Sequence, residues 1–100
     1  MTAFIITKDR IDSDAVGTIG PRSASDADEA RLRSGEGVAF RLLDDDREVY
    51  YYGRRLEESD ADASYDGEPE LAPLDCFGTP NAGAVIQEEK DADGVWRAIN

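Results

Sequence analysis

The chain has 100 residues, with 23 acidic side chains, 11 basic side chains and no histidine, so its formal net charge at pH 7 is −12. This length corresponds to one domain, residues 1–100. A hydrophobic content of 40% is enough for one core without disulfide or metal cross-links. The negative charge argues against direct binding to nucleic acid or to an anionic membrane surface. The single cysteine, Cys76, excludes an intrachain disulfide.

The N-terminal apolar run ends at Ile6 and is followed by no small-residue cleavage site, so we do not interpret it as a signal peptide. No stretch approaches the 18 apolar residues of a membrane-spanning helix. We therefore expect a cytoplasmic protein.

The first half of the chain predicts one strand and one helix before the main sheet. Residues 3–7 are short, apolar and β-branched, which is typical of a strand, and residues 8–22 are turns with a short extended piece at 16–19. Ser25 is a candidate helix N-cap, with acidic residues in the first turn and arginines in the last. Gly35 is placed to end this helix, which has a thin apolar face and needs tertiary packing.

Two hairpins dominate the rest of the chain. Residues 37–43 and 48–52 form a strand pair around the polar turn at 44–47, and residues 84–89 and 95–99 form another around an Asp-Gly turn. Residues 74–83 are expected to be an ordered connector. The pattern predicts an α+β fold, an antiparallel sheet of about five short strands with one short helix on one face. The predicted core comprises Phe4, Ile6, Val38, Phe40, Leu42, Val49, Tyr51, Val85 and Trp96.

Residues 57–73 are predicted to be an acidic loop that is too polar for the core. The stretch from residue 57 to residue 75 contains eight acids and no base, so it supplies −8 of the net charge of −12. A protein that is acidic only for general solubility would spread its charge more evenly. This segregation favours a binding face.

Catalysis and metal binding find little support. Without histidine there is no base to activate Cys76, which we expect to be a small core residue. Asp62, Ser64, Asp66 and Gly67 follow the spacing of a calcium loop, but Pro73 stands where a bidentate glutamate is needed. We therefore expect neither an enzyme nor a bound cofactor.

The turn Asp44-Asp45-Asp46 crowds three carboxylates, and their repulsion is expected to raise some of their pKa values. A metal ion or an arginine-rich partner would relieve that repulsion, although aspartate is also an ordinary turn residue. In Tyr50-Tyr51-Tyr52, at least one ring is expected to pack inward and at least one to be exposed. Exposed tyrosine beside charge is common at protein interfaces, and ordinary cross-strand packing is the alternative.

These features favour an acidic inhibitor or adaptor that binds a basic protein, in particular a nucleic-acid-binding protein, as a mimic of nucleic acid. In size and composition the chain is similar to small acidic inhibitors carried by phages and mobile elements, such as anti-CRISPR and anti-restriction proteins, although it has no family motif. The alternative is a structural or accessory domain whose acidity reflects its host. The expected partner-binding residues are Asp44, Asp45, Asp46, Tyr50, Tyr52, Glu57, Glu58, Asp60, Asp62, Tyr65, Asp66, Glu68 and Glu70.

Overall fold

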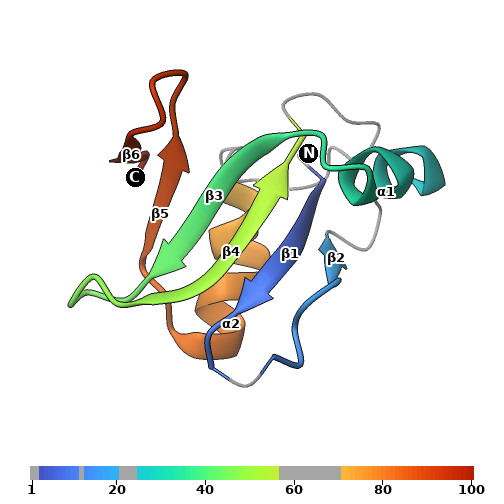
Figure 1. The fold of residues 1–100 in the computed structure, drawn as a ribbon. Helices are drawn as coiled ribbons and strands as arrows, with labels where there is room; N and C mark the ends of the chain where they lie inside the picture. The colour runs from blue at the N-terminus through green and yellow to red at the C-terminus, as the bar shows by residue number, and fades with distance from the viewer. Residues whose placement is uncertain (1–2, 12, 21–24, 57–70) are drawn as a thin grey trace.

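The structure is a computed structural model that describes residues 3–11, 13–20, 25–56 and 71–100. Within these ranges, six strands form one antiparallel sheet in the order β2-β1-β4-β3-β5-β6 (Figure 1). This confirms the predicted α+β fold, with one strand more than expected. The strands are β1 (Phe4–Asp9), β2 (Ile19–Gly20), β3 (Val38–Leu43), β4 (Val49–Arg55), β5 (Ile86–Lys90) and β6 (Trp96–Ala98).

Both predicted hairpins are present. β3 pairs with β4, with Leu42 opposite Tyr51, and β5 pairs with β6, with Lys90 opposite Trp96. β4 continues through Gly53 to Arg55, so this stretch extends the strand. The additional strand, β2, is only two residues long and pairs with the start of β1.

The first helix, α1 (Asp26–Arg33), begins and ends as predicted. Ser25 caps it, since its hydroxyl oxygen accepts a hydrogen bond of 3.1 Å from the backbone N–H of Asp28. Gly35 follows the helix with a φ of 94°, a left-handed conformation that glycine adopts without strain. The helix packs Leu32 into a small cluster with Ala3, Ile5 and Leu56.

The ordered connector expected at 74–83 is helical, which was not predicted: the chain forms a π-helical turn, η2 (Leu74–Gly78), followed by α2 (Thr79–Ala82). Gly78 explains the close approach of this segment, since a Cβ there would lie 2.9 Å from Leu42 Cδ1. The wide π turn also brings Phe77 against Tyr51, with 4.8 Å between the ring centroids. Figure 1 shows α2 behind the sheet, so the sheet has a second helical cover that was not predicted.

The acidic loop was predicted to extend through residue 73, but Ala72 and Pro73 are helical, lead directly into η2 and are buried. The predicted C-terminal bound of the loop was too late, because these two apolar residues were grouped with the acids that precede them. We correct the C-terminal bound of the loop accordingly.

The main core lies between the sheet and the η2–α2 segment. Of the predicted core residues, Phe4, Ile6, Phe40, Leu42 and Tyr51 are buried in it. Val38 and Val49 are only half-buried. The prediction is wrong for Val85, which is 47% exposed just before β5, and for Trp96, which lies half-buried on the edge strand β6.

Candidate interaction surfaces

The acidic turn at the tip of the β3–β4 hairpin is organised by Asp44. Its Oδ1 accepts hydrogen bonds from the backbone N–H groups of Asp46 (2.8 Å) and Glu48 (2.9 Å). The turn closes through Arg47, which adopts a left-handed φ of 65°. Asp44 is therefore the residue that shapes the turn, while Asp45 and Asp46 project into solvent.

Tyr50 uses its hydroxyl group within the same turn. It lies at a β-bulge, where the register shifts between Leu42 and Leu43 on the partner strand, and it donates a 3.0 Å hydrogen bond to Asp44 Oδ2. Tyr50 also packs against the main core. It is thus a structural partner of Asp44, and its hydroxyl is engaged inside the molecule.

These bonds overturn one expectation about the three aspartates. The backbone N–H of Glu48, the Tyr50 hydroxyl and the backbone N–H of Asp46 lower the pKa of Asp44 below its ordinary value. The prediction was that crowding raises some of the three pKa values, and for Asp44 the pKa changes in the opposite direction. The same contact raises the pKa of Tyr50, since ionised Tyr50 could no longer donate to Asp44.

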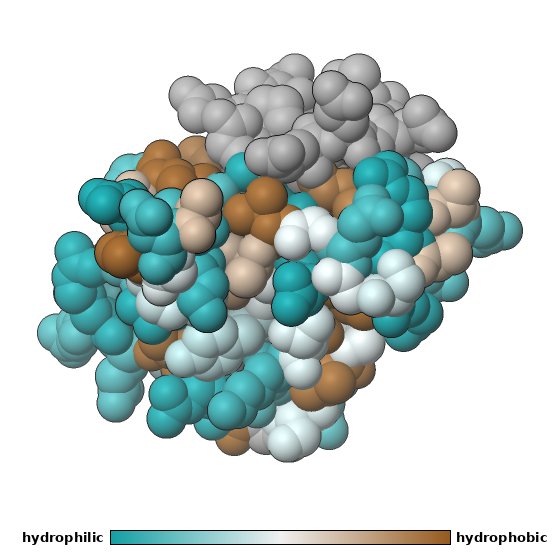
Figure 2. Space-filling model, turned by 45° about the horizontal axis from the view of Figure 1, so that its top comes forward, coloured by the Kyte–Doolittle hydropathy of each residue, from teal (hydrophilic) through white to brown (hydrophobic). Residues whose placement is uncertain are grey.

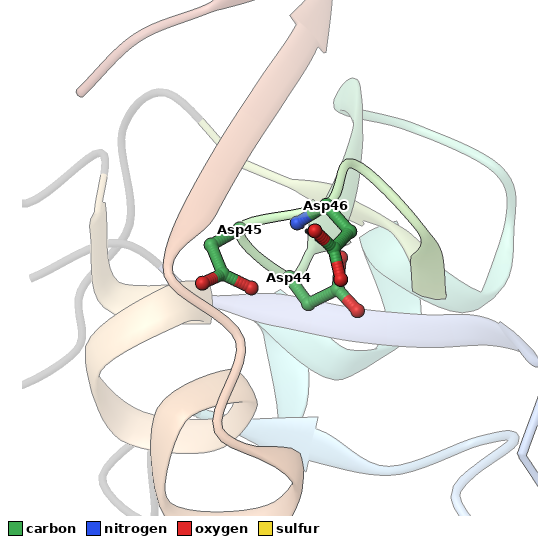
Figure 3. Close-up of side chains that lie close together, drawn as sticks. All are labelled: Asp44, Asp45 and Asp46. Carbon is green, nitrogen blue, oxygen red and sulfur yellow. Dashed lines mark hydrogen bonds between the residues drawn. The ribbon is translucent and has the colours of Figure 1, made fainter.

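The three aspartates also offer a possible set of metal ligands. One carboxylate oxygen from each lies within 4.8 Å of the others. Figure 3 shows that all three side chains come from one tight turn and that no other element supplies a labelled side chain. Asp44 already accepts three hydrogen bonds, so among the described residues the turn offers two unengaged carboxylates. Two carboxylates are too few ligands for a strong Ca²⁺ or Mg²⁺ site.

A second acidic turn, which the sequence analysis did not select, joins β5 to β6. Asp91 Oδ1 accepts hydrogen bonds from the backbone N–H groups of Asp93 and Val95, both at 2.9 Å. Asp91 Oδ2 accepts a hydrogen bond of 2.6 Å from Arg97. Arg97 and the backbone donors together lower the pKa of Asp91. The Asp-Gly turn signal located this hairpin but did not reveal the role of its first aspartate.

Tyr52 lies on the sheet face opposite the main core. Its ring meets that of Trp96 edge to face, with 6.0 Å between centroids, and Lys8 Nζ lies 5.7 Å from the Tyr52 centroid. The Trp96 ring is flanked by the Arg41 guanidinium at 4.5 Å and by Lys90 Nζ at 5.5 Å. We call these five residues the cation–aromatic row.

Sequence reasoning selected only Tyr52 from this row. The alternation of side chains along a strand could have identified Arg41. It lies between the core residues Phe40 and Leu42 and must therefore point to the opposite face. Trp96 was predicted to lie in the core. The structure instead places it on the face that the η2–α2 segment leaves uncovered.

Two glutamates on β5 are neutralised within the sheet. Glu88 is buried and accepts hydrogen bonds from Arg41 (2.6 Å) and Arg47 (2.9 Å). Its neighbour Glu89 pairs with Arg55 on the other face of the sheet. Buried carboxylates need such partners, so these acids are parts of the scaffold.

Cys76 is exposed on η2, so the expectation that it occupies the core is wrong. Partial burial of the thiol and the neighbouring Asp75 raise its pKa. A raised thiol pKa reduces the thiolate fraction near neutral pH, which is the opposite of what a nucleophilic cysteine requires.

The other residues expected to bind a partner, and the calcium-loop pattern at 62–67, lie outside the described residues. Those partner-binding residues are Glu57, Glu58, Asp60, Asp62, Tyr65, Asp66, Glu68 and Glu70.

On the face shown in Figure 2, hydrophilic and hydrophobic residues are interspersed and form no single apolar patch. None of the helices in the described ranges has the length and apolarity to cross a membrane. No family model, no curated protein and no solved structure matches the chain.

Proposed function

We propose that this chain is a non-catalytic binding domain that docks on a basic surface of another protein and blocks it. The observation that carries the proposal is the segregation of charge, since residues 57–75 hold −8 of the net charge of −12. A basic surface is the complementary partner for such a concentration of negative charge. A cytoplasmic nucleic-acid-binding protein is the partner class that we infer, and mimicry of nucleic acid is the form of inhibition.

The tip of the β3–β4 hairpin supports this proposal. Asp45 and Asp46 are exposed, and no described residue donates to their carboxylates or pairs with them. Their charges are therefore available to an arginine or lysine of a partner. Carboxylates on adjacent strands, about 4.8 Å apart, can approach the charge spacing of duplex DNA.

A second candidate, a structural or accessory domain without a basic partner, is favoured by a different observation. Asp44, Asp91, Glu88 and Glu89 all accept hydrogen bonds within the molecule. Part of the acidity therefore stabilises the sheet. On this alternative, the acids at 57–75 reflect the host environment and have no specific partner.

Affinity capture separates the two candidates. The immobilised chain is exposed to a lysate at low salt and then eluted with a salt gradient, with and without duplex DNA as competitor. The first proposal expects a nucleic-acid-binding protein that elutes early in the gradient and loses its nucleic acid when bound. Retention of no basic protein near 50 mM salt, where ionic contacts are weakly screened, would reject it.

A charge-matched pair of variants sharpens this experiment. The quadruple variant Glu57→Lys, Glu58→Lys, Asp60→Lys and Asp62→Lys is expected to abolish capture. The control changes four dispersed, exposed carboxylates to lysine and so has the same net charge. These are Asp14, Asp26, Glu36 and Asp93. Equal loss of capture in both variants would indicate a bulk charge effect and would contradict a localised binding face.

A further inference from the structure

The uncovered face of the sheet is cationic in a protein with a net charge of −12. Lys8, Tyr52, Arg41 and Glu88 lie side by side across four strands, each opposite the next in register. Glu88 is the only acid in this line, and it is already neutralised by two arginines. Figure 1 shows no described helix in front of β3 and β4. Within this line, Lys8 is exposed, Tyr52 and Arg41 are half-buried, and Glu88 is buried.

A cavity of about 360 Å³ adjoins this face between α1 and β1. Ile5, Val16 and Leu32 contribute apolar lining, and Arg33 and Arg54 contribute guanidinium groups. Arg54 is two residues from Tyr52 on the same strand, so both side chains lie on one face. The cavity and the cation–aromatic row are therefore parts of one surface.

Apart from Arg41, which pairs with Glu88, the cations of this surface form no short ion pair with the described residues. Among the described residues, no carboxylate lies within ion-pair distance of Lys8, Lys90 or Arg54. Among the described residues, Arg54 donates a long hydrogen bond of 3.5 Å to the Gly37 carbonyl, and Arg33 reaches both Glu29 and the Gly17 carbonyl at 3.4 Å. A carboxylate-bearing ligand could pair with these groups and would disrupt no strong ion pair.

We propose that this surface binds an acidic polypeptide segment of a partner protein, with an apolar side chain of that segment in the cavity between α1 and β1. Carboxylates of the segment pair with Arg33 and Arg54 at the cavity and with Lys8 and Lys90 along the row. The occupant is thus opposite in charge to the basic partner proposed above, and this inference does not rest on that proposal.

Single-stranded nucleic acid is disfavoured as the occupant. Bases would need free aromatic faces, but the Tyr52 ring has Lys8 over it, and Trp96 has Arg41 and Lys90. A polyanion with one charge per nucleotide is also repelled by the net charge of −12. A short acidic peptide is repelled less, because at physiological salt charges beyond about 8 Å are largely screened.

Trp96 is the only tryptophan in the chain and lies within the proposed surface, so its fluorescence reports binding. The full chain is titrated with a glutamate heptapeptide that carries a central leucine, and fluorescence anisotropy of the labelled peptide serves as the second measurement. We expect saturable binding that weakens with salt. Replacing the central leucine by aspartate is expected to weaken binding, because the cavity lining is apolar.

Two double variants of equal net charge test the location. Lys8→Gln with Lys90→Gln is expected to weaken peptide binding about tenfold. Arg31→Gln with Arg97→Gln is expected to leave it unchanged. Arg97 lies opposite Glu89 and therefore on the other face, and Arg31 is outside the cavity lining. Circular dichroism confirms that all variants are folded.

Three outcomes would overturn the inference. The first is the absence of saturable peptide binding, and the second is an equal effect of the two double variants. The third is tighter binding of a 15-nucleotide thymidine oligomer than of the peptide, which would assign the surface to nucleic acid. The variants at residues 57–62 change none of the residues named in this surface, so failure here is distinguishable from failure of the proposed function.

Discussion

Asp44 and Asp91 occupy the same position in the two hairpin turns of the sheet and form the same network. Each accepts hydrogen bonds at Oδ1 from the backbone N–H groups two and four residues later. Each turn also closes through a left-handed residue at its fourth position, Arg47 with a φ of 65° and Gly94 with a φ of 81°. Both turns therefore depend on a first-position carboxylate.

The equivalence predicts which acids stabilise the fold. Replacing Asp44 or Asp91 by alanine removes an acceptor from two backbone N–H groups, so each change is expected to lower the melting temperature. Asp45→Ala and Asp93→Ala are the matched controls, because no hydrogen bond from the described residues of the turn reaches these exposed side chains. Both changes are expected to leave the melting temperature nearly unchanged. Thermal unfolding followed by circular dichroism measures all four. Equal shifts at all four positions would contradict the prediction.

The same carboxylates make stability depend on pH. The pKa of Asp44 and that of Asp91 are both lowered from the ordinary value of 3.8. A carboxyl group with a lowered pKa in the folded state stabilises it fully above the unfolded-state pKa, and this stabilisation is lost as the pH falls through the folded-state pKa. Urea unfolding between pH 2 and pH 6 is therefore expected to show a fall in stability that begins near pH 4.

Neutral amide side chains provide the control for this titration. The double variant Asp44→Asn with Asp91→Asn keeps a carbonyl acceptor in each turn but cannot titrate. Its stability is expected to fall less steeply below pH 4 than that of the parent chain. A parallel decline in both proteins would assign the acid sensitivity to other carboxylates.

Substitutions at the fourth turn position are expected to change the free energy of unfolding in opposite directions in the two hairpins. Gly94→Ala places a Cβ on a residue with a φ of 81° and is expected to cost about 1 kcal/mol. Arg47→Gly removes left-handed strain of similar size but also removes one of two arginine partners of Glu88. Because Arg41 still pairs with Glu88 and Arg47 is 64% exposed, relief of strain is expected to dominate. Denaturant unfolding would contradict this if Arg47→Gly proved as damaging as Gly94→Ala.

The sequence predicted the features that depend on local chemistry. Ser25 and Gly35 marked the ends of α1, and the Asp-Gly pair marked the second hairpin. These signals act within a few residues of their effect, so they can be read without knowledge of the fold. The alternation of β3 also placed Phe40 and Leu42 correctly in the core.

The features that were missed depend on tertiary contacts. The π-helical turn at 74–78 contains Gly78, and its packing on Leu42 is visible only once the sheet is known. Trp96 was predicted to lie in the core, yet its strand lies at the sheet edge and turns the ring toward Arg41 and Lys90. The cationic character of the open face was hidden because its cations come from separate strands, whereas the acids are contiguous in sequence.

Two phenylalanine rings cover glycines of neighbouring strands, and this makes the glycines sensitive to substitution for different reasons. A Cβ on Gly20 would overlap the ring of Phe4, whereas a Cβ on Gly53 would overlap both the ring of Phe40 and the backbone carbonyl of Ile5. Gly20→Ala is expected to cost about 1–3 kcal/mol, as overpacked cores do. Gly53→Ala is expected to cost more, because a central strand cannot withdraw its backbone without losing its ladder bonds.

A trimmed ring separates these two causes. In a Phe4→Leu background, Gly20→Ala is expected to lower the free energy of unfolding much less, because the smaller side chain leaves room for the methyl group. In a Phe40→Leu background, Gly53→Ala is expected to keep most of its cost, since the Ile5 carbonyl still occupies the space. Urea unfolding of both double-mutant cycles measures the two coupling free energies. Equal coupling at the two sites would show that ring overlap alone sets the penalty and that the β1 backbone yields to a new methyl group.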